Sequence, residues 1–577
     1  MSEPRITRRR LLATSALISV AASLPSRVLA ATTSAMTFIL GRPSSSSVAV
    51  NVISPVTTTA YIEYGYTSGK YTAKTSVVRL TANVPTTIEI TGLRANTRTY
   101  YRVRTGTTTA SAEASCMTKR AAGAAFAFTV QGDSHPERAG QMFNSDLYMR
   151  TMANVAAQKP DFHVLLGDDF SIDPLLDKGA ASAADIDAVY ARQRPYLNVL
   201  GHNTAVFLVN GNHEQAAAYL LDGSATSPAV LAGKSRLRYF ALPSNGDMYS
   251  VDTANIPQLG SPRDYYAWTW GDATFITLDP YWHSKLPVDN VATSAATAAA
   301  GKATKKGTSK TSDLWEVGLG DEQYEWFKQQ LESCTAKYIF VFAHHVMGTG
   351  RGAVENSYFY EWGGKDPKNK VTFAEKRPTW EAPIHDLMVK HGVSVFFQGH
   401  DHIFVHQERD GLVYQSMPNP ADDTFTMFNS DAYTSGTKAP NSGHVRVSVS
   451  ATEAKVEYFL AARPQDEGDD PKNLRVAHSY SVSALKPAFM IDLGDIFMID
   501  KLSSKTDANM RARYELMRGF YNKLDPSIPL HFAMGNHDGE TAWDKLPGHA
   551  LRAEYFPDQT SDLNYYAIEQ GNAIFIV

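Results

Sequence analysis

The sequence has little cysteine, no strong excess of either charge and, beyond its first thirty residues, no long apolar run. Cys116 and Cys334 are its two cysteines in 577 residues. Two thiols exclude a zinc site built from cysteine thiolates, and they either pair in an oxidising compartment or stay inert. The net charge of −4 gives no electrostatic footprint for nucleic acid or for an anionic membrane. No later segment reaches the roughly 20 apolar residues that a membrane-spanning helix requires.

The length and composition are those of a soluble protein with more than one domain. A chain of 577 residues, with 43% hydrophobic and 20% charged residues, exceeds the size at which a single core stops growing. We therefore expect at least two domains.

The first thirty residues have the pattern of an export signal. Three arginines at 8–10 precede an apolar run that ends at Ala22, and Ala30 closes a stretch with small residues suited to cleavage. The pattern resembles a twin-arginine signal, so we expect residues 1–30 to be recognised by the twin-arginine export machinery and removed, leaving a periplasmic or extracellular protein. The alternative, a short membrane anchor, is disfavoured because the apolar run is short and Pro25 follows it.

Residues 36–118 predict a small β-domain. Gly, Pro, Ser and Asn separate short β-branched or aromatic runs, which lie at 48–52, 59–64, 87–90 and 100–104. The region of Leu93, Thr97 and Tyr100 resembles the tyrosine corner of fibronectin type III-like β-sandwiches. This domain has no cluster of potential metal ligands.

Residues 124–483 predict an α/β layered domain. Apolar strand-like runs alternate with helical stretches such as 181–200 and 321–332. Residues 291–312 are small, polar and dotted with lysine, which favours a mobile surface insertion.

The end of the chain, residues 487–577, looks like a partial copy of residues 160–278. Three segments match in the same order: 487–495 with 160–168, 532–538 with 208–214, and 564–567 with 264–267. The copy retains three polar residues, Asp495, Asn536 and His537, but ends before any counterpart of the later motifs. We therefore expect a truncated copy without an active site of its own.

Five polar motifs each follow an apolar, strand-like run. In layered α/β proteins, sites form at the carboxyl ends of strands, so these motifs can meet in one crevice. One such motif alone is weak, because Gly-Asp is usually a turn and a single histidine is usually structural. Five in succession are a strong signal. In chain order they are Gly132-Asp133-Ser134-His135, Gly167-Asp168-Asp169, Gly211-Asn212-His213-Glu214, Ala343-His344-His345 and Gly399-His400-Asp401-His402.

These residue types suit a pair of metal ions that hydrolyse a phosphoester. Two metals about 3.5–4 Å apart neutralise the phosphoryl oxygens and supply a nucleophile at neutral pH. Asp168 is the natural bridging carboxylate. The remaining candidate ligands divide into Asp133, His135 and His402 for one metal, and Asn212, His344 and His400 for the other. The donors fit two divalent or trivalent transition metals such as Fe, Mn or Zn.

The motifs resemble those of the calcineurin-like metallophosphoesterase superfamily over residues 124–482. The resemblance implies a four-layered αββα domain, a dinuclear centre and attack by a metal-bound hydroxide. The preceding sandwich is similar to that of purple acid phosphatases. The sequence departs from that branch because His135 is present and Ser171 stands where the branch has a tyrosinate ligand. We therefore expect a protein that is not purple.

Three further residues are candidates for contact with the substrate. The resemblance implies that His213 faces the phosphate and stabilises the transition state or donates a proton. Arg351 lies in a glycine-rich loop and either reaches the phosphate or is a solvated side chain. His345 either supports the site or points away from His344, as alternation along a strand predicts.

The leading hypothesis is an exported phosphoesterase that acts on phosphomonoesters or phosphodiesters. The alternative is a non-catalytic extracellular binding protein whose metal centre is structural. The sequence does not select among phosphatase, nucleotidase and phosphodiesterase, because these differ in the shape of the pocket.

Overall fold

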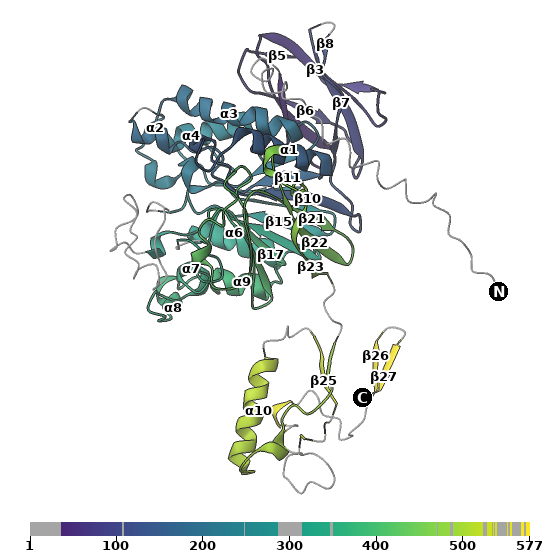
Figure 1. The fold of residues 1–577 in the computed structure, drawn as a ribbon, viewed down its shortest axis with the longest axis vertical. Helices are drawn as coiled ribbons and strands as arrows, with labels where there is room; N and C mark the ends of the chain where they lie inside the picture. The colour runs from purple at the N-terminus through teal and green to yellow at the C-terminus, as the bar shows by residue number, and fades with distance from the viewer. Residues whose placement is uncertain are drawn as a thin grey trace, which may run out of the picture. The chain divides into compact units, whose positions relative to one another are not determined.

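The computed structural model consists of two compact units, residues 1–482 and residues 483–577 (Figure 1). The predicted signal and the predicted insertion at 291–312 lie outside the described residues. The described residues are 36–106, 109–179, 181–246, 248–284, 286, 314–346, 350–469, 471–484, 489–522, 528–533, 535, 537, 538, 551, 554–556, 567–570 and 573–576.

The first unit begins with the predicted β-sandwich, and each of the four predicted runs forms a strand. One sheet pairs β1 (Thr37–Gly41), β2 (Ser47–Ile53) and β6 (Thr86–Thr91). The other sheet contains β4 (Ala73–Lys74), β3 (Thr58–Gly65), β7 (Arg98–Thr105) and β8 (Thr109–Ala110), with β5 (Val78–Leu80) on β3 and β9 (Ala114–Met117) on β7. Alternating burial along β7 places Tyr101 and Val103 inside the sandwich.

Buried hydrogen bonds join the sandwich to the next domain. The guanidinium of Arg194 donates at 2.9 Å both to the carbonyl of Asn51 in the sandwich and to that of Tyr239. The hydroxyl of Tyr101 donates to the carbonyl of His202 at 2.7 Å. Because Arg194 is buried, each lost contact would leave a desolvated donor, so the two domains pack as one body.

Two sheets form the centre of the α/β domain. The first has the order β12 (Ala205–Leu208), β11 (Phe162–Leu165), β10 (Phe126–Gln131), β21 (Gly443–Val449), β22 (Glu453–Leu460) and β23 (Val476–Ser483). The second has the order β13 (Tyr249–Val251), β14 (Tyr266–Trp270), β15 (Ala273–Thr277), β16 (Tyr338–Phe342), β17 (Val395–Gln398), β19 (Leu412–Ser416), β18 (Phe404–Arg409) and β20 (Thr437–Ala439). Strands β10, β11 and β12 are parallel, as are β15, β16, β17 and β19.

Helices cover the outer faces of both sheets, which confirms the predicted four-layered αββα fold (Figure 1). The first sheet packs against α1 (Ser145–Gln158), α3 (Ala183–Gly201) and α4 (Pro228–Tyr239). The second packs against α6 (Gly320–Glu332) and α9 (Ile384–Lys390). Three shorter helices are α2 (Asp173–Asp177), α7 (Tyr360–Gly363) and α8 (Phe373–Lys376).

Aromatic rings fill the space between the two sheets. Phe128 on β10 lies 5.1 Å from Phe275 on β15 and 5.2 Å from Phe340 on β16, measured between ring centroids. Truncation of such a buried ring typically costs about 3–5 kcal/mol. This dry layer holds the strands in place, and it therefore fixes the positions at which the motifs emerge.

The second unit is a small α/β fragment with its own core. Strands β24 (Met490–Asp492) and β25 (Leu530–Phe532) are parallel, α10 spans Asp507–Tyr521, and β26 (Ala567–Gln570) pairs with β27 (Ala573–Ile576). The N–H of His537 donates to Asp495 Oδ1 at 2.9 Å, as that of His213 does to Asp168 Oδ1. This contact agrees with the predicted partial repeat, which stays a prediction.

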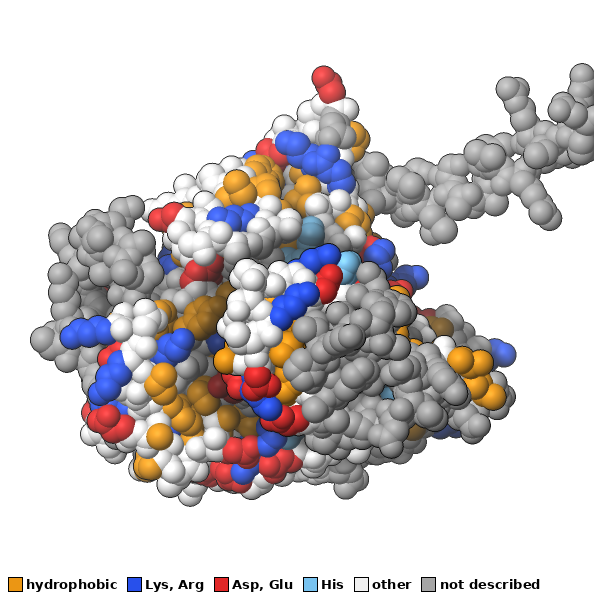
Figure 2. Space-filling view, turned by 90° about the horizontal axis from the view of Figure 1, so that it is seen from below, with side chains coloured by type: hydrophobic (Ala, Val, Ile, Leu, Met, Phe, Trp, Pro, Cys, Tyr) orange, Lys and Arg blue, Asp and Glu red, His pale blue; other side chains and the backbone are white. Residues whose placement is uncertain are grey.

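The described residues also bear on the remaining sequence-based expectations. Cys116 and Cys334 are not joined, and burial raises the pKa of the Cys116 thiol to about 12. On the face seen in Figure 2, Lys and Arg side chains are interspersed with Asp and Glu. Among the described helices, none combines the length and the apolar character needed to cross a membrane.

Candidate metal centre

The five motifs lie where strands of the two facing sheets end. Neighbouring strands β10, β11 and β12 lead into the first three motifs, and β16 and β17 of the other sheet lead into the last two. The motifs of the two facing sheets therefore meet at one edge of the sheet pair, at the carboxyl ends of parallel strands.

Two motif glycines are required because the carboxylates lie against them. A Cβ on Gly211 would lie 2.3 Å from Asp168 Oδ1, and one on Gly399 would lie 2.3 Å from Asp133 Oδ1. No side chain fits at such distances. The motifs therefore need glycine at these two positions for the backbone to approach each carboxylate.

Several candidate ligands adopt the left-handed backbone conformation, which residues other than glycine rarely occupy. The φ angles are 49° at His135, 59° at Asp168, 67° at His400 and 54° at His402. Such strain persists where the surrounding structure enforces it, and it is concentrated at functional sites. Here all four residues lie within four positions of the end of β10, β11 or β17.

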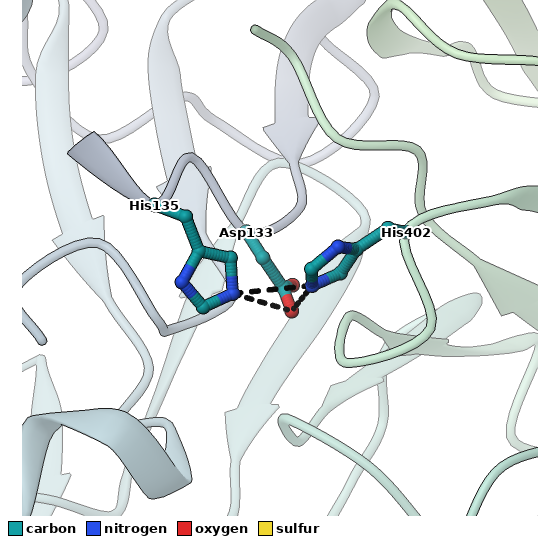
Figure 3. A group of neighbouring side chains, drawn as sticks. All are labelled: Asp133, His135 and His402. Carbon is teal, nitrogen blue, oxygen red and sulfur yellow. Dashed lines mark hydrogen bonds and ion pairs between the residues drawn. The ribbon is translucent and has the colours of Figure 1, made fainter. Parts of the chain in front are cut away.

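The first group of candidate ligands consists of Asp133, His135 and His402, all buried (Figure 3). Nε2 of His402 lies 3.0 Å from Asp133 Oδ2 and 3.1 Å from Nε2 of His135. The three donor atoms point toward one another from β10 and β17 of the two sheets. This is the grouping that the sequence predicted for one metal.

The second group consists of Asp168, His344 and His400, with Asn212 beside them. Nε2 of His344 lies 3.1 Å from Asp168 Oδ2, 3.0 Å from Asn212 Oδ1 and 3.3 Å from Nδ1 of His400. All four side chains are buried.

Asp168 lies between the two groups. The same oxygen, Oδ2, is 3.1 Å from Nε2 of His344 in the second group and 3.7 Å from Nε2 of His135 in the first. Burial acts to raise the pKa of this carboxyl, but His344 and His213 hold it well below its usual value. An ionised carboxylate between two clusters of imidazoles has the position that a bridging ligand requires.

The chemistry of this cluster fits cations. His400 Nε2 and His402 Nδ1 are buried atoms without a hydrogen-bond partner among the described residues. Burial lowers the pKa of His135 and of His400 well below the usual value, which leaves neutral imidazoles able to coordinate a metal. Buried carboxylates beside neutral imidazoles are the donor set expected for transition metals.

His213 lies at the edge of this cluster, next to two carboxylates and the guanidinium of an arginine. Its Nδ1 contacts Oδ2 of Asp173, and its Nε2 lies 3.8 Å from Asp168 Oδ2 and 3.2 Å from Nη2 of Arg138. Burial opposes its charge, but Asp168 and Asp173 together raise the pKa of His213 to about 9. A protonated imidazole here is able to donate a hydrogen bond or a proton to an anion.

The two candidate substrate residues lie beside His400. The guanidinium of Arg351 contacts the carbonyl of His400 and lies 3.3 Å from Asp401 Oδ1. His345 is buried, its ring lies 4.8 Å from that of His400, and its Nδ1 is 3.2 Å from the hydroxyl of Tyr281. Both side chains are placed to support the ligand loop, and their direct contact with a substrate stays a prediction.

Sequence reasoning missed four residues that support the site: Glu137, Arg138, Asp173 and Glu214. Oε1 of Glu137 lies 2.7 Å from Nδ1 of His135. Glu214 accepts four backbone N–H bonds from the loops that carry Asp168 and Asn212. The signal for Glu214 was its place in the Gly-Asn-His-Glu motif, whereas Arg138 and Asp173 stand outside every motif.

The comparisons with known proteins agree with this architecture. Residues 126–404 match the family model described as calcineurin-like phosphoesterase. The solved structure of PhoD is similar with a TM-score of 0.53 at 15% identity, covering 78% of this chain and 90% of that one. The structure of purple acid phosphatase PPD1 from yellow lupin (Lupinus luteus) seeds has a TM-score of 0.51 at 14% identity, covering 78% and 74%. No curated protein matches the sequence.

The resemblance seen in the motifs is thereby confirmed by the family match and by the shared fold. The domain that contains residues 126–404 matches the calcineurin-like phosphoesterase family, as the motifs predicted.

Proposed function

We propose that this protein is an exported phosphoesterase that uses two transition metal ions to hydrolyse phosphomonoesters or phosphodiesters. The observation that carries the proposal is the position of Asp168, whose Oδ2 faces His135 of one candidate metal group and His344 of the other. A single carboxylate between two sets of buried donors is the arrangement that holds a pair of metals.

The residues that would hold the metals are those of the two groups around Asp168. Asp133, His135 and His402 belong to one metal, and Asn212, His344 and His400 to the other, with Asp168 between them. When bound, Fe, Mn or Zn ions would neutralise charge on the phosphoryl oxygens and lower the pKa of water.

The side chains at the edge of the centre would act on the phosphate itself. Nε2 of His213 is held toward the centre by the contact between Nδ1 and Asp173, and Nη2 of Arg138 lies 3.2 Å from it. Among the described residues, Nη1 of Arg138 contacts only the weak acceptor Sδ of Met142, at 3.3 Å. Arg138 and His213 therefore offer two adjacent donors to a phosphoryl oxygen.

The reaction would exchange one oxygen on phosphorus for another. The oxygen of a water forms a bond to phosphorus, the bond from phosphorus to the leaving-group oxygen breaks, and a proton passes to that oxygen. His213 is placed to stabilise the charge that develops or to supply the proton.

The test is a hydrolysis assay on the mature protein loaded with Fe, Mn or Zn, using a panel of chromogenic phosphomonoesters and phosphodiesters. Turnover that is lost in Asp168→Asn would support the proposal. Metal-loaded protein that binds a phosphate analogue without hydrolysing any ester would contradict it and favour the non-catalytic binding protein.

Export is part of the proposal and rests on the arginines at positions 8–10 and the apolar run that follows. Replacement of all three arginines by lysine should retain the protein in the cytoplasm, because the twin-arginine machinery reads the arginine pair. Cell fractionation measures this. Unchanged export of the lysine variant would contradict the twin-arginine route.

A further inference from the structure

An aromatic ring is exposed beside the first group of candidate ligands. Phe428 is 41% exposed, and its ring lies 5.7 Å from that of His402 at an interplanar angle of 26°. Its neighbour Met427 is 48% exposed. These two large apolar side chains are exposed to water beside a candidate metal ligand. They therefore lack the stabilisation that burial would give.

The segment that carries this ring is fixed to the ligand loop. The side-chain amide of Asn429 donates to the carbonyl of Asp401, between His400 and His402, at 3.2 Å. On the other side, the N–H of Asn441 donates to the carbonyl of Thr426 at 3.1 Å. These two hydrogen bonds hold the chain on both sides of Phe428.

Contacts between rings connect Phe428 to the candidate centre. The neighbouring His402 lies 4.8 Å from His135, which in turn lies 5.2 Å from His213, all between ring centroids. The donors proposed for the phosphoryl oxygens, His213 and Arg138, are linked to Phe428 through these contacts. Phe428 therefore borders the centre at which a phosphoester would bind.

We propose that Phe428 and Met427 form a leaving-group subsite that selects phosphoesters whose leaving group carries an aromatic ring. This rests on the proposed function and adds the class of substrate to it. The exposed face of Phe428 would stack on the substrate ring in an offset arrangement, and the flexible side chain of Met427 would pack against its edge. A small aliphatic leaving group would gain neither contact.

Binding of two phosphonates to the metal-loaded full chain tests the subsite without turnover. Phenylphosphonate and methylphosphonate present similar anionic groups, but only the first carries a ring. We expect calorimetry to give about 3- to 10-fold tighter binding of phenylphosphonate, the gain typical of an aromatic pair. Phe428→Ala should remove that preference and leave methylphosphonate binding unchanged. Phe428→Tyr should keep it, and so should Val371→Ala, which alters an apolar residue that is 70% exposed.

Kinetics supply the second readout. In Phe428→Ala, kcat/KM for phenyl phosphate should fall about 3- to 10-fold, mainly through KM, while that for glycerol 3-phosphate stays within twofold. Equal affinity of the wild type for both phosphonates, or equal losses on both esters in Phe428→Ala, would overturn the subsite while leaving the phosphoesterase activity standing. Wild-type protein that binds neither phosphonate and hydrolyses neither ester would overturn the subsite and the proposed function together.

Discussion

Oε2 of Glu214 accepts a hydrogen bond from the backbone N–H of Asp168 at 2.9 Å, so a residue of the third motif fixes the central carboxylate of the second. The same oxygen accepts from the N–H of Gly211 at 2.8 Å, and Oε1 accepts from those of Asp169 and Phe170 at 2.8 and 2.9 Å. One buried side chain thereby holds two ligand loops together.

Glu214→Ala should lower both stability and metal content. The substitution leaves up to four backbone donors in the protein interior without their acceptor, and each such loss costs about 1–3 kcal/mol. We expect a Tm several degrees lower and less than two metals per chain by elemental analysis. Glu325→Ala, at an exposed position on α6, is the control. A Glu214→Ala protein with full metal content would show that the loops hold their positions without it.

Substitutions of the ligands should differ in how many metals they remove. We expect two metals per chain in the wild type, about one in His135→Ala or Asn212→Ala, and loss from both sites in Asp168→Asn, because one oxygen of Asp168 faces both groups. Elemental analysis of the purified variants measures this. Active wild-type protein with at most one metal per chain would contradict the two-metal centre.

Asp173→Asn should reduce kcat more than it changes KM. The Asp173 carboxylate contacts Nδ1 of His213 and so directs Nε2 toward the centre, a role that a neutral amide fills less well. We expect a fall in kcat of about 10-fold or more. Asp177→Asn, near the end of the same short helix and exposed, should leave kcat within twofold. Equal kcat values for the two variants would show that Asp173 does not position His213.

The stability of the protein should fall as the pH rises through neutrality, partly because of Asp279. Burial, together with the nearby carboxylate of Asp264, raises the pKa of Asp279 to about 8, against about 4 in an unfolded chain. Between these two values the folded state holds more protons than the unfolded state. The contribution of this group to stability is therefore greatest below pH 4 and decreases up to pH 8, by at most about 1.4 kcal/mol per pH unit.

Asp279→Asn removes that titration while keeping an oxygen that can accept from the N–H of Tyr281, as Oδ1 does at 2.6 Å. We expect Tm to depend less steeply on pH in this variant than in the wild type between pH 5 and 8. Asp386→Asn, at an exposed position, should keep the wild-type slope. Identical slopes for all three proteins would show that Asp279 is ionised throughout.

A chain that ends after Ser483 should keep its metals and its activity. The described part of the second unit has its own small core around Phe497, Tyr514 and Phe532. The sequence beyond residue 483 lacks the first and the last motifs. Circular dichroism, elemental analysis and the phosphoester assay on the shortened chain test this. A folded short chain that has lost metal or activity would assign a role to residues 484–577.

The sequence by itself determined which residues form the strands and where each strand ends. The apolar runs that precede the first, second and fourth motifs form β10, β11 and β16. This worked because each run is apolar and is closed by a glycine or by a polar motif, so local composition and chain stiffness suffice. The candidate ligands could be named for the same reason.

Only the tertiary structure decided how these ends meet and what surrounds them. Local patterns do not reveal that the first three motifs emerge from one sheet and the last two from the sheet that faces it. That arrangement depends on packing of Phe128 against Phe275 and Phe340, which lie more than a hundred residues away. The contacts of Asp173 and Arg138 with His213, and of Phe428 with His402, likewise join side chains that no motif connects. Such contacts depend on where distant loops lie in the folded protein, which cannot be read from the spacing of residues in the sequence.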